Sequence, residues 1–281
     1  MGTHATETTP ESNELATSTS GDDAGRTEDR VSLGRWRWPA TLLPAGVSAF
    51  ALLVPLWILG LWLVNSEAGR RPSLAFEPIQ VLNSVSVSAA AAVVAALTAI
   101  PVAYFAANHD SPLAVVFERA TYVGFAVPGI VLALALVYFG SGYAPWIYQT
   151  LPLLIFAYVV RFLPQAVGSA RTSILQVDRR LVEAGRTLGE SPTGAFRRVT
   201  FPLTRSGIVA GAALVFLTTM KELPVTLVLR PSGFDTIVTQ IWRAQSTALY
   251  QYAVVPTLIL LVISGLSMVV ILTQEGGEEG L

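Results

Sequence analysis

The stretch "EAGRTLGESPTGAFRRVTFPL", residues 183–203, decides the fold, because it interrupts a very apolar chain with a basic, sharply bent segment. Just upstream, apolar residues recur in steps of three and four, which is the spacing of one stripe along an α-helix. The stripe consists of Ile174, Val177, Leu181, Ala184 and Leu188. We therefore expect one helix that runs into this segment.

The segment itself predicts a helical hairpin. Gly189 follows the last residue of the stripe, which is the usual place for a left-handed helix end. Ser191 then caps a second, short helix with Pro192 at its first position, and Pro202 closes it. Two interpretations stay open. Either Phe196, an aromatic side chain with basic neighbours, docks on a partner protein, or the hairpin lies on lipid headgroups.

Composition places the chain in a membrane. Of 281 residues, 52% are hydrophobic and 13% are charged, with a mean hydropathy of +0.56, whereas soluble domains carry about 25% charged residues. The net charge of −1 gives no indication of partners. The chain has no Cys and only two His, His4 and His109. Thiolate and multi-His sites are therefore excluded, and we expect no metal site in this chain.

Apolar windows predict an all-α integral membrane protein with six transmembrane helices, since each span needs about 20 apolar residues. The expected spans are about 41–64, 81–106, 119–139, 146–165, 203–223 and 252–273. They form a transmembrane domain over 38–274, with a loop over 167–202 between spans four and five. Residues 1–37 are polar and predict a disordered tail, and residues 275–281 form a short C-terminal tail.

Basic residues set the expected orientation. The region 161–205 contains many arginines and few acids, so by the positive-inside rule it lies in the cytoplasm. Six spans then place both termini in the cytoplasm and make the chain a multi-pass protein of the cell membrane. The arginines are Arg161, Arg171, Arg179, Arg180, Arg186, Arg197, Arg198 and Arg205.

Two features of the spans are candidates for a pathway or gate. Pro128, which precedes Gly129, kinks its span, either as a hinge or merely as a packing kink. Lys221 and Glu222 end an apolar run, and ionisable groups at membrane depth usually face a cavity or each other. They predict a pathway-lining pair with Arg230, or else a pair at the outer interface whose lysine reaches the headgroups.

The hairpin resembles the "EAA" loop of the inner-membrane permeases of ABC importers. That pattern reads E-A-A, three residues, G, nine residues, I, one residue, then L-P. Here Glu183-Ala184-Gly185, Gly189, Val199 and Phe201-Pro202 match its spacing, with Gly185, Val199 and Phe201 as mild departures. The strings "MKELPVTLVLRPSGFDTIVTQIW" (220–242) and "VPGIVLALAL" (127–136) resemble the ferric-iron branch of these permeases.

The resemblance implies a function. The chain is then a permease subunit that forms half of a translocation pathway, most similar to the second half of fused ferric-iron permeases. The loop residues that contact the ATPase are then Glu183, Ala184, Gly185, Gly189, Phe196 and Pro202. The resemblance also implies an outer loop near Arg230 and Asp235 where a binding protein docks. Permeases for thiamine, polyamines or oxyanions are close alternatives.

The implied partners follow from the same resemblance. They are an ABC ATPase dimer, a second permease subunit (a second copy or a related half), an extracytoplasmic solute-binding protein and membrane lipid, with no nucleic acid. The chain has no P-loop motif, and its one lysine is Lys221. We therefore expect no cofactor on this chain, with ATP and Mg²⁺ on the partner ATPase.

Two other classes compete with transport. An intramembrane enzyme needs paired carboxylates, a His cluster or a Ser/Lys dyad at membrane depth, and the sequence offers only Lys221 with nearby threonines. We therefore expect no catalytic residues. A scaffold that binds a partner through the hairpin remains a further alternative.

Overall fold

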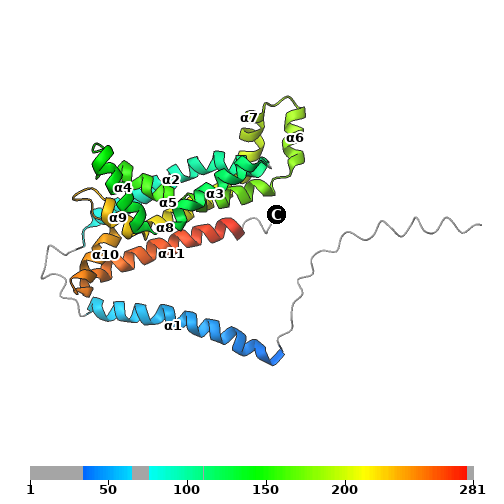
Figure 1. Ribbon diagram of the computed structural model, residues 1–281. Helices are drawn as coiled ribbons and strands as arrows, with labels where there is room; N and C mark the ends of the chain where they lie inside the picture. Colours follow the sequence, from blue (N-terminus) through cyan, green and yellow to red (C-terminus); the bar gives the residue numbers. More distant parts are fainter. Residues whose placement is uncertain (1–33, 65–75, 110, 277–281) are drawn as a thin grey trace, which may run out of the picture. The chain divides into compact units, whose positions relative to one another are not determined.

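The computed structural model describes residues 34–64, 76–109 and 111–276, and these residues form helices and turns without any strand (Figure 1). The predicted all-α membrane fold is confirmed. Five of the described helical segments are long and apolar enough to cross a membrane, and a sixth span results if one bent helix pair is counted as one.

The first helix, α1, runs from Arg37 to Val64 and contains Pro44 and Pro55. A short 3₁₀ turn, η1 (Gly34–Trp36), precedes it. Residues 34–37 therefore do not belong to the disordered tail that was expected over 1–37, because they are helical. Residues 1–33 lie outside the described part of the chain, as do 277–281 of the expected C-terminal tail, whereas 275 and 276 end α11.

The bundle is built around α2 (Pro78–Asn108), α5 (Leu151–Gln176) and α8 (Phe201–Met220), which pack against one another. A run of buried alanines lines the inner face of α2 and lets its neighbours approach closely. Gly211 on α8 does the same, because a Cβ there would lie 3.1 Å from the Cα of Ala166 on α5. The buried alanines of α2 are Ala91, Ala92, Ala95, Ala99 and Ala103.

The third expected span is broken. Helices α3 (Pro112–Ala126) and α4 (Gly129–Tyr143) are bent by 97° at Val127–Pro128. Pro128 lacks an N–H and disfavours helical geometry at the residue before it, which ends α3 there. The kink that Pro128 predicts within the expected span over 119–139 is thus a complete break, and α3 begins seven residues before that span.

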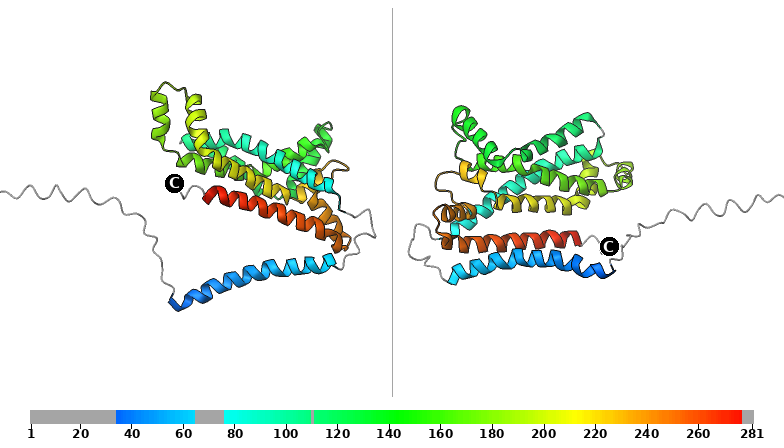
Figure 2. Two further views of the ribbon diagram at one scale, coloured as in Figure 1. Left: turned by 180° about the vertical axis from the view of Figure 1, so that it is seen from behind. Right: turned by 60° about the horizontal axis from the view of Figure 1, so that its bottom comes forward.

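Short helices occupy the two ends of the bundle (Figure 2). At one end, α6 (Arg179–Thr187), α7 (Pro192–Ala195) and a π-helical turn, η4 (Phe196–Thr200), form the projecting hairpin. At the opposite end lie α9 (Pro224–Leu229), α10 (Ile237–Ser246) and the 3₁₀ turn η5 (Tyr250–Ala253). The last helix, α11 (Val254–Gly276), follows η5.

The helix predicted to carry the stripe into the hairpin is in fact two helices. α5 ends at Gln176, and Val177 has an extended backbone. Asp178 caps α6, because its Oδ1 accepts the N–H of Arg180 at 2.9 Å. The stripe from Ile174 to Leu188 therefore does not lie on one face, since the side-chain cap of Asp178 starts a new helix.

Candidate functional site

The predicted glycine end of the first hairpin helix is present. Gly189 has φ +93°, in the left-handed region. Its N–H donates to the carbonyl of Arg186 at 3.1 Å, and the N–H of Glu190 donates to the carbonyl of Gly185 at 3.2 Å. This pair of bonds is a Schellman motif, which satisfies the last carbonyls of α6 and turns the chain sharply.

The second leg begins as the sequence predicts. Ser191 Oγ accepts the N–H of Gly194 at 3.1 Å, and Pro192 occupies the first position of α7. Glu190 and Arg198 form an ion pair across the leg. The π-helical turn η4 then joins α7 to α8, so that a continuous helical segment runs from Pro192 to Met220.

Phe196 is not the exposed aromatic anchor that its basic neighbours indicate. Its ring is half-buried and packs edge-on against Tyr104 of α2, with a centroid distance of 5.0 Å. The most exposed large apolar side chain of the hairpin is instead Leu188, beside the Gly189 turn. Phe196 therefore fastens the hairpin to the bundle.

Glu183 lines an open cavity of about 210 Å³ at the base of the hairpin. Arg179 and Arg186 of α6 line the same cavity with Tyr104 and Asn108 of α2. Among the residues that the structure describes, no ion pair joins Glu183 to any of these arginines. Its carboxylate is exposed and is available to another molecule.

The other loop-pattern positions support the hairpin's shape. A Cβ on Gly185 would lie 3.5 Å from Val199 Cγ2, which is ordinary contact distance, so the two legs meet at these two positions. Ala184 is exposed, and its carbonyl accepts the N–H of Leu188 at 3.1 Å. Pro202 lies in the first turn of α8 and is exposed.

The pathway candidates are separated by the structure. Glu222 is buried, but Lys221 is exposed, and Arg230 pairs with Asp235 instead. The proposed pair of Lys221 and Glu222 with Arg230 is therefore not formed. Glu222 lies instead beside Arg161 of α5, with Glu222 Oε2 3.5 Å from Arg161 Nε.

Arg161 also reaches the break between α3 and α4. Its Nη1 donates to the carbonyl of Val127 at 2.9 Å. Pro128 follows that carbonyl, and Gly129 begins α4 directly against the pair, since a Cβ there would lie 2.8 Å from Glu222 Oε1. One Arg–Glu pair thus joins α5, the bend at Pro128 and the segment before α9.

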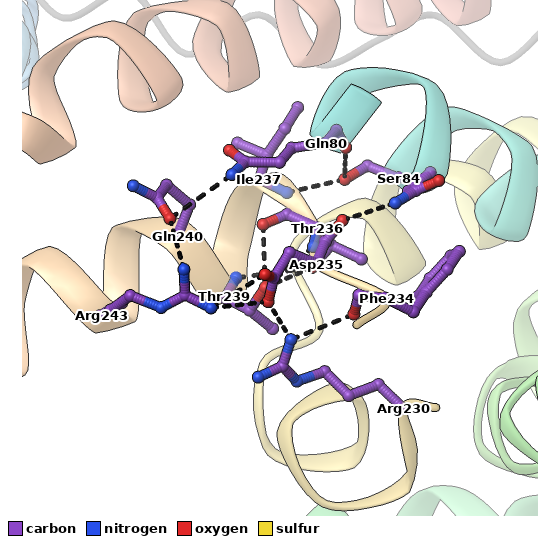
Figure 3. A network of polar contacts seen from close by, with 11 residues as sticks. Gln80, Ser84, Arg230, Phe234, Asp235, Thr236, Ile237, Thr239, Gln240 and Arg243 are labelled. Atoms are coloured by element: carbon purple, nitrogen blue, oxygen red, sulfur yellow. Dashed lines mark hydrogen bonds and ion pairs between the residues drawn. The ribbon is translucent and has the colours of Figure 1, made fainter. Parts of the chain in front are cut away.

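At the opposite end from the hairpin, Asp235 is held by two arginines (Figure 3). Arg243 Nη2 lies 2.9 Å from both carboxylate oxygens, and Arg230 Nη1 pairs with Oδ1 and donates to the carbonyl of Phe234 at 3.1 Å. Burial by itself raises the pKa of Asp235, but the hydrogen bond from Arg243 and the charges of both arginines outweigh it. The pKa is therefore held below its ordinary value of 3.8.

Buried polar contacts anchor this Asp235 segment to α2 (Figure 3). Asn83 Nδ2 donates to the carbonyl of Asp235 at 2.9 Å, and Ser84 Oγ accepts the N–H of Ile237 at 2.8 Å. Gln80 Nε2 lies 3.5 Å from Gln240 Oε1. The segment before α10 is thus fixed by side chains that lie more than 150 residues away in sequence.

Sequence reasoning missed several of these residues. It counted Arg161 among the arginines of the cytoplasmic region 161–205, although the expected fourth span, 146–165, includes this residue. In the structure Arg161 is the eleventh residue of α5. It also gave no role to Tyr158, whose hydroxyl lies 2.5 Å from Thr226 Oγ1 at the start of α9. The available signal was position: both residues lie within the expected fourth span, 146–165, where a polar group needs a partner.

Comparison with known proteins gives a consistent assignment. Residues 99–274 match the family described as "Binding-protein-dependent transport system inner membrane component". Over 184 residues the chain is 37% identical to the Fe(3+)-transport system permease protein FbpB 2 of Haemophilus influenzae. That match covers 66% of this chain but 36% of the relative, so the chain spans about a third of that protein's length.

A second relative is matched over more of its length. The probable molybdenum ABC transporter permease of Haloferax volcanii is 31% identical over 215 residues, which cover 74% of this chain and 78% of that protein. Among solved structures, a bacterial alginate ABC transporter in complex with its alginate pentasaccharide-bound periplasmic protein has a chain with the same fold. The TM-score is 0.61 at 16% identity, covering 85% of this chain and 92% of that one. The chain therefore belongs to the binding-protein-dependent family of inner-membrane permease subunits of ABC importers.

Proposed function

We propose that this chain forms half of the translocation pathway of an ABC importer for ferric iron, which an extracytoplasmic solute-binding protein delivers. The observation that supports ferric iron as the substrate is the 37% identity to the Fe(3+)-transport permease over 184 residues. Because the chain corresponds to about a third of that relative, a second permease unit completes the pathway, as a second copy or a related subunit.

The hairpin faces the cytoplasm in this proposal, and both termini lie there too. Five arginines on the hairpin support this orientation by the positive-inside rule. At the opposite end, Arg230 and Arg243 both form ion pairs with Asp235, so their positive charge is partly neutralised. The hairpin arginines are Arg179, Arg180, Arg186, Arg197 and Arg198.

The hairpin docks on a partner ATPase dimer, which binds ATP and Mg²⁺. Glu183 and Leu188 are exposed for this contact, while the Gly189 turn fixes the angle between the legs. Since the second leg continues into α8, a displacement of the hairpin is carried along a rigid helix toward α9 at the far end. Closure of the ATPase dimer therefore opens the pathway toward the binding protein.

Co-purification from native membranes tests the assembly. The full-length, affinity-tagged chain is extracted in mild detergent, and its partners are identified by mass spectrometry. We expect an ABC ATPase together with a second permease unit, and we expect Glu183→Lys to lose the ATPase while keeping the permease partner. An intact chain that carries no ATPase would refute the docking role of the hairpin and favour a lipid-surface or scaffold role.

An oxyanion is the second candidate substrate. It is favoured by the 31% identity to the probable molybdenum permease, which is matched over 78% of its length. Uptake of radiolabelled ferric iron and of radiolabelled molybdate, compared in cells with and without the chain, separates the two candidates. Dependence of molybdate uptake alone would replace iron as the proposed substrate.

A further inference from the structure

The carboxylate of Glu222 lies where three structural elements meet. Its Oε2 is 3.5 Å from Arg161 Nε on α5, and its Oε1 accepts the N–H of Val225 at 3.3 Å in the first turn of α9. Gly129, at the start of α4, is so close that a side chain there would collide with Oε1. The carboxylate therefore faces a guanidinium and the positive first turns of two helices.

Arg161 supplies a bond that the broken span needs. Val127 lies at the break, and its carbonyl accepts the 2.9 Å hydrogen bond from Arg161 Nη1. An unpaired carbonyl is costly in an apolar membrane domain, so helix breaks occur there only where a neighbour satisfies the freed group. Arg161 is about 15 Å along α5 from its first residue, near the middle of a bilayer-spanning helix.

The pair is better suited to fixing geometry than to adding stability. Both side chains are largely buried, and a buried ion pair is often no more stabilising than apolar side chains of the same volume. Within the described part of the chain, Arg161 Nε has no hydrogen-bond partner, so the contact with Glu222 is a charge contact without a hydrogen bond. Such a contact can be released and re-formed without large rearrangement of hydrogen bonds.

We propose that Arg161 is a positioning residue for transport, which fixes the angle between α3 and α4 by joining the Val127 carbonyl to Glu222. While the pair is intact, α4 and α9 stay attached to α5. When the pair separates, the bend at Pro128 is free to change the angle between α3 and α4. Helix α4 then moves together with α9, against which it packs. This inference concerns the chain's own conformation and does not depend on the substrate.

A second ion pair of the same kind provides a matched control. Arg171, also on α5, lies with its Nε 3.5 Å from Glu118 Oε1 on α3. Its Nε likewise has no hydrogen-bond partner among the described residues. This pair joins α5 to α3 but touches neither Val127 nor α9. Its removal therefore deletes a charge contact between α5 and α3 without disturbing the bend at Pro128.

The distance between spin labels on α3 and α4 measures the bend. The chain contains no Cys, so two cysteines introduced at exposed Leu113 and Tyr138 carry the only labels. From the helical rise, straightening the 97° bend lengthens the distance between these sites by about 10 Å. The distribution of distances between the two labels is recorded by pulsed electron paramagnetic resonance on the purified full-length chain in lipid nanodiscs.

We expect Arg161→Met and Glu222→Gln to broaden the distribution and to add longer distances. Arg171→Met should retain the wild-type distribution. Glu222→Gln keeps the side-chain volume and an acceptor for the Val225 N–H, so it tests the Arg161–Glu222 pair even if Arg161→Met does not fold. Unchanged distances in Glu222→Gln, or equal broadening in Arg171→Met, would overturn the proposal. Because no transport is measured, neither result bears on the proposed substrate.

Discussion

Gly129 faces the carboxylate of Glu222 so closely that a methyl group on Gly129 would lie 2.8 Å from Glu222 Oε1. The same methyl group would lie 3.1 Å from the guanidinium carbon of Arg161. Glycine is thus the residue that lets the start of α4 approach a buried ion pair. The packing of α4 and the position of the ion pair therefore depend on each other.

Gly129→Ala should destabilise the chain by about 1 kcal/mol, the lower end of the cost of overpacking, because the added methyl group meets the ends of the Glu222 and Arg161 side chains. Gly142→Ala, on the same helix, is the matched control, since nothing lies within 4 Å of a Cβ there. That control should be neutral or slightly stabilising, because alanine favours the helix. Thermal unfolding in detergent micelles measures both, and equal midpoints in the two variants would contradict the close approach.

A second close approach joins α5 to α8. A Cβ on Gly207 would lie 1.6 Å from Ser173 Oγ and 2.6 Å from Ser173 Cβ. Gly207→Ala should therefore lower the unfolding midpoint, at a cost of about 1–3 kcal/mol. Adding Ser173→Gly should recover part of the loss, because it removes the colliding side chain. A double variant no more stable than Gly207→Ala alone would show that the collision is not the cause.

The Asp235 segment should be sensitive to acid. Its folded-state pKa is lower than in the unfolded chain, so the unfolded state binds the proton more readily. The stabilisation from Asp235 is therefore present at neutral pH and is lost as pH falls below about 4, through the folded pKa. The midpoint difference between wild type and Asp235→Asn should shrink over that range. A difference that stays constant from pH 7 to pH 3 would be inconsistent with this linkage.

Gly189→Val should loosen the end of α6, because a β-branched residue is strained at φ +93°. The strain of about 1–2 kcal/mol corresponds to a roughly 5- to 30-fold faster hydrogen exchange of the backbone amides at positions 189 and 190, which close the Schellman motif. Gly189→Asn is the control, since asparagine tolerates the left-handed region. Hydrogen exchange by mass spectrometry over 183–190 reads the effect, and identical exchange in both variants would argue against it.

Local chemistry made part of this structure predictable from the sequence. Gly189 and Ser191 act through their own backbone and side chain, so the bend and the second helix start follow from residue type. The apolar windows likewise coincide with helices that are long and apolar enough to cross a membrane. The break at Val177–Asp178 was missed because the apolar stripe crosses it, although Asp178 is a good N-cap residue.

Long-range pairing was the part that sequence could not supply. Arg161 was counted among the arginines of the cytoplasmic region 161–205, because it is the first charged residue after the uncharged window 120–160. Its burial depends on Glu222, which lies 61 positions away in the chain. Phe196 was expected to be exposed, because nothing near it in sequence indicates the ring of Tyr104. The lesson is that a charge inside a long apolar segment should be matched to a distant counter-ion before it is assigned to a loop.

The most direct test of the central claim is uptake of radiolabelled ferric iron in the native host. Cells that lack the chain are compared with cells that express the wild type or Glu183→Lys at matched membrane levels. We predict that iron uptake is lost without the chain, is restored by the wild type and stays low with Glu183→Lys, while molybdate uptake is unaffected. Iron uptake that is the same in all three strains would contradict the proposal that this permease imports ferric iron through an ATPase docked at the hairpin.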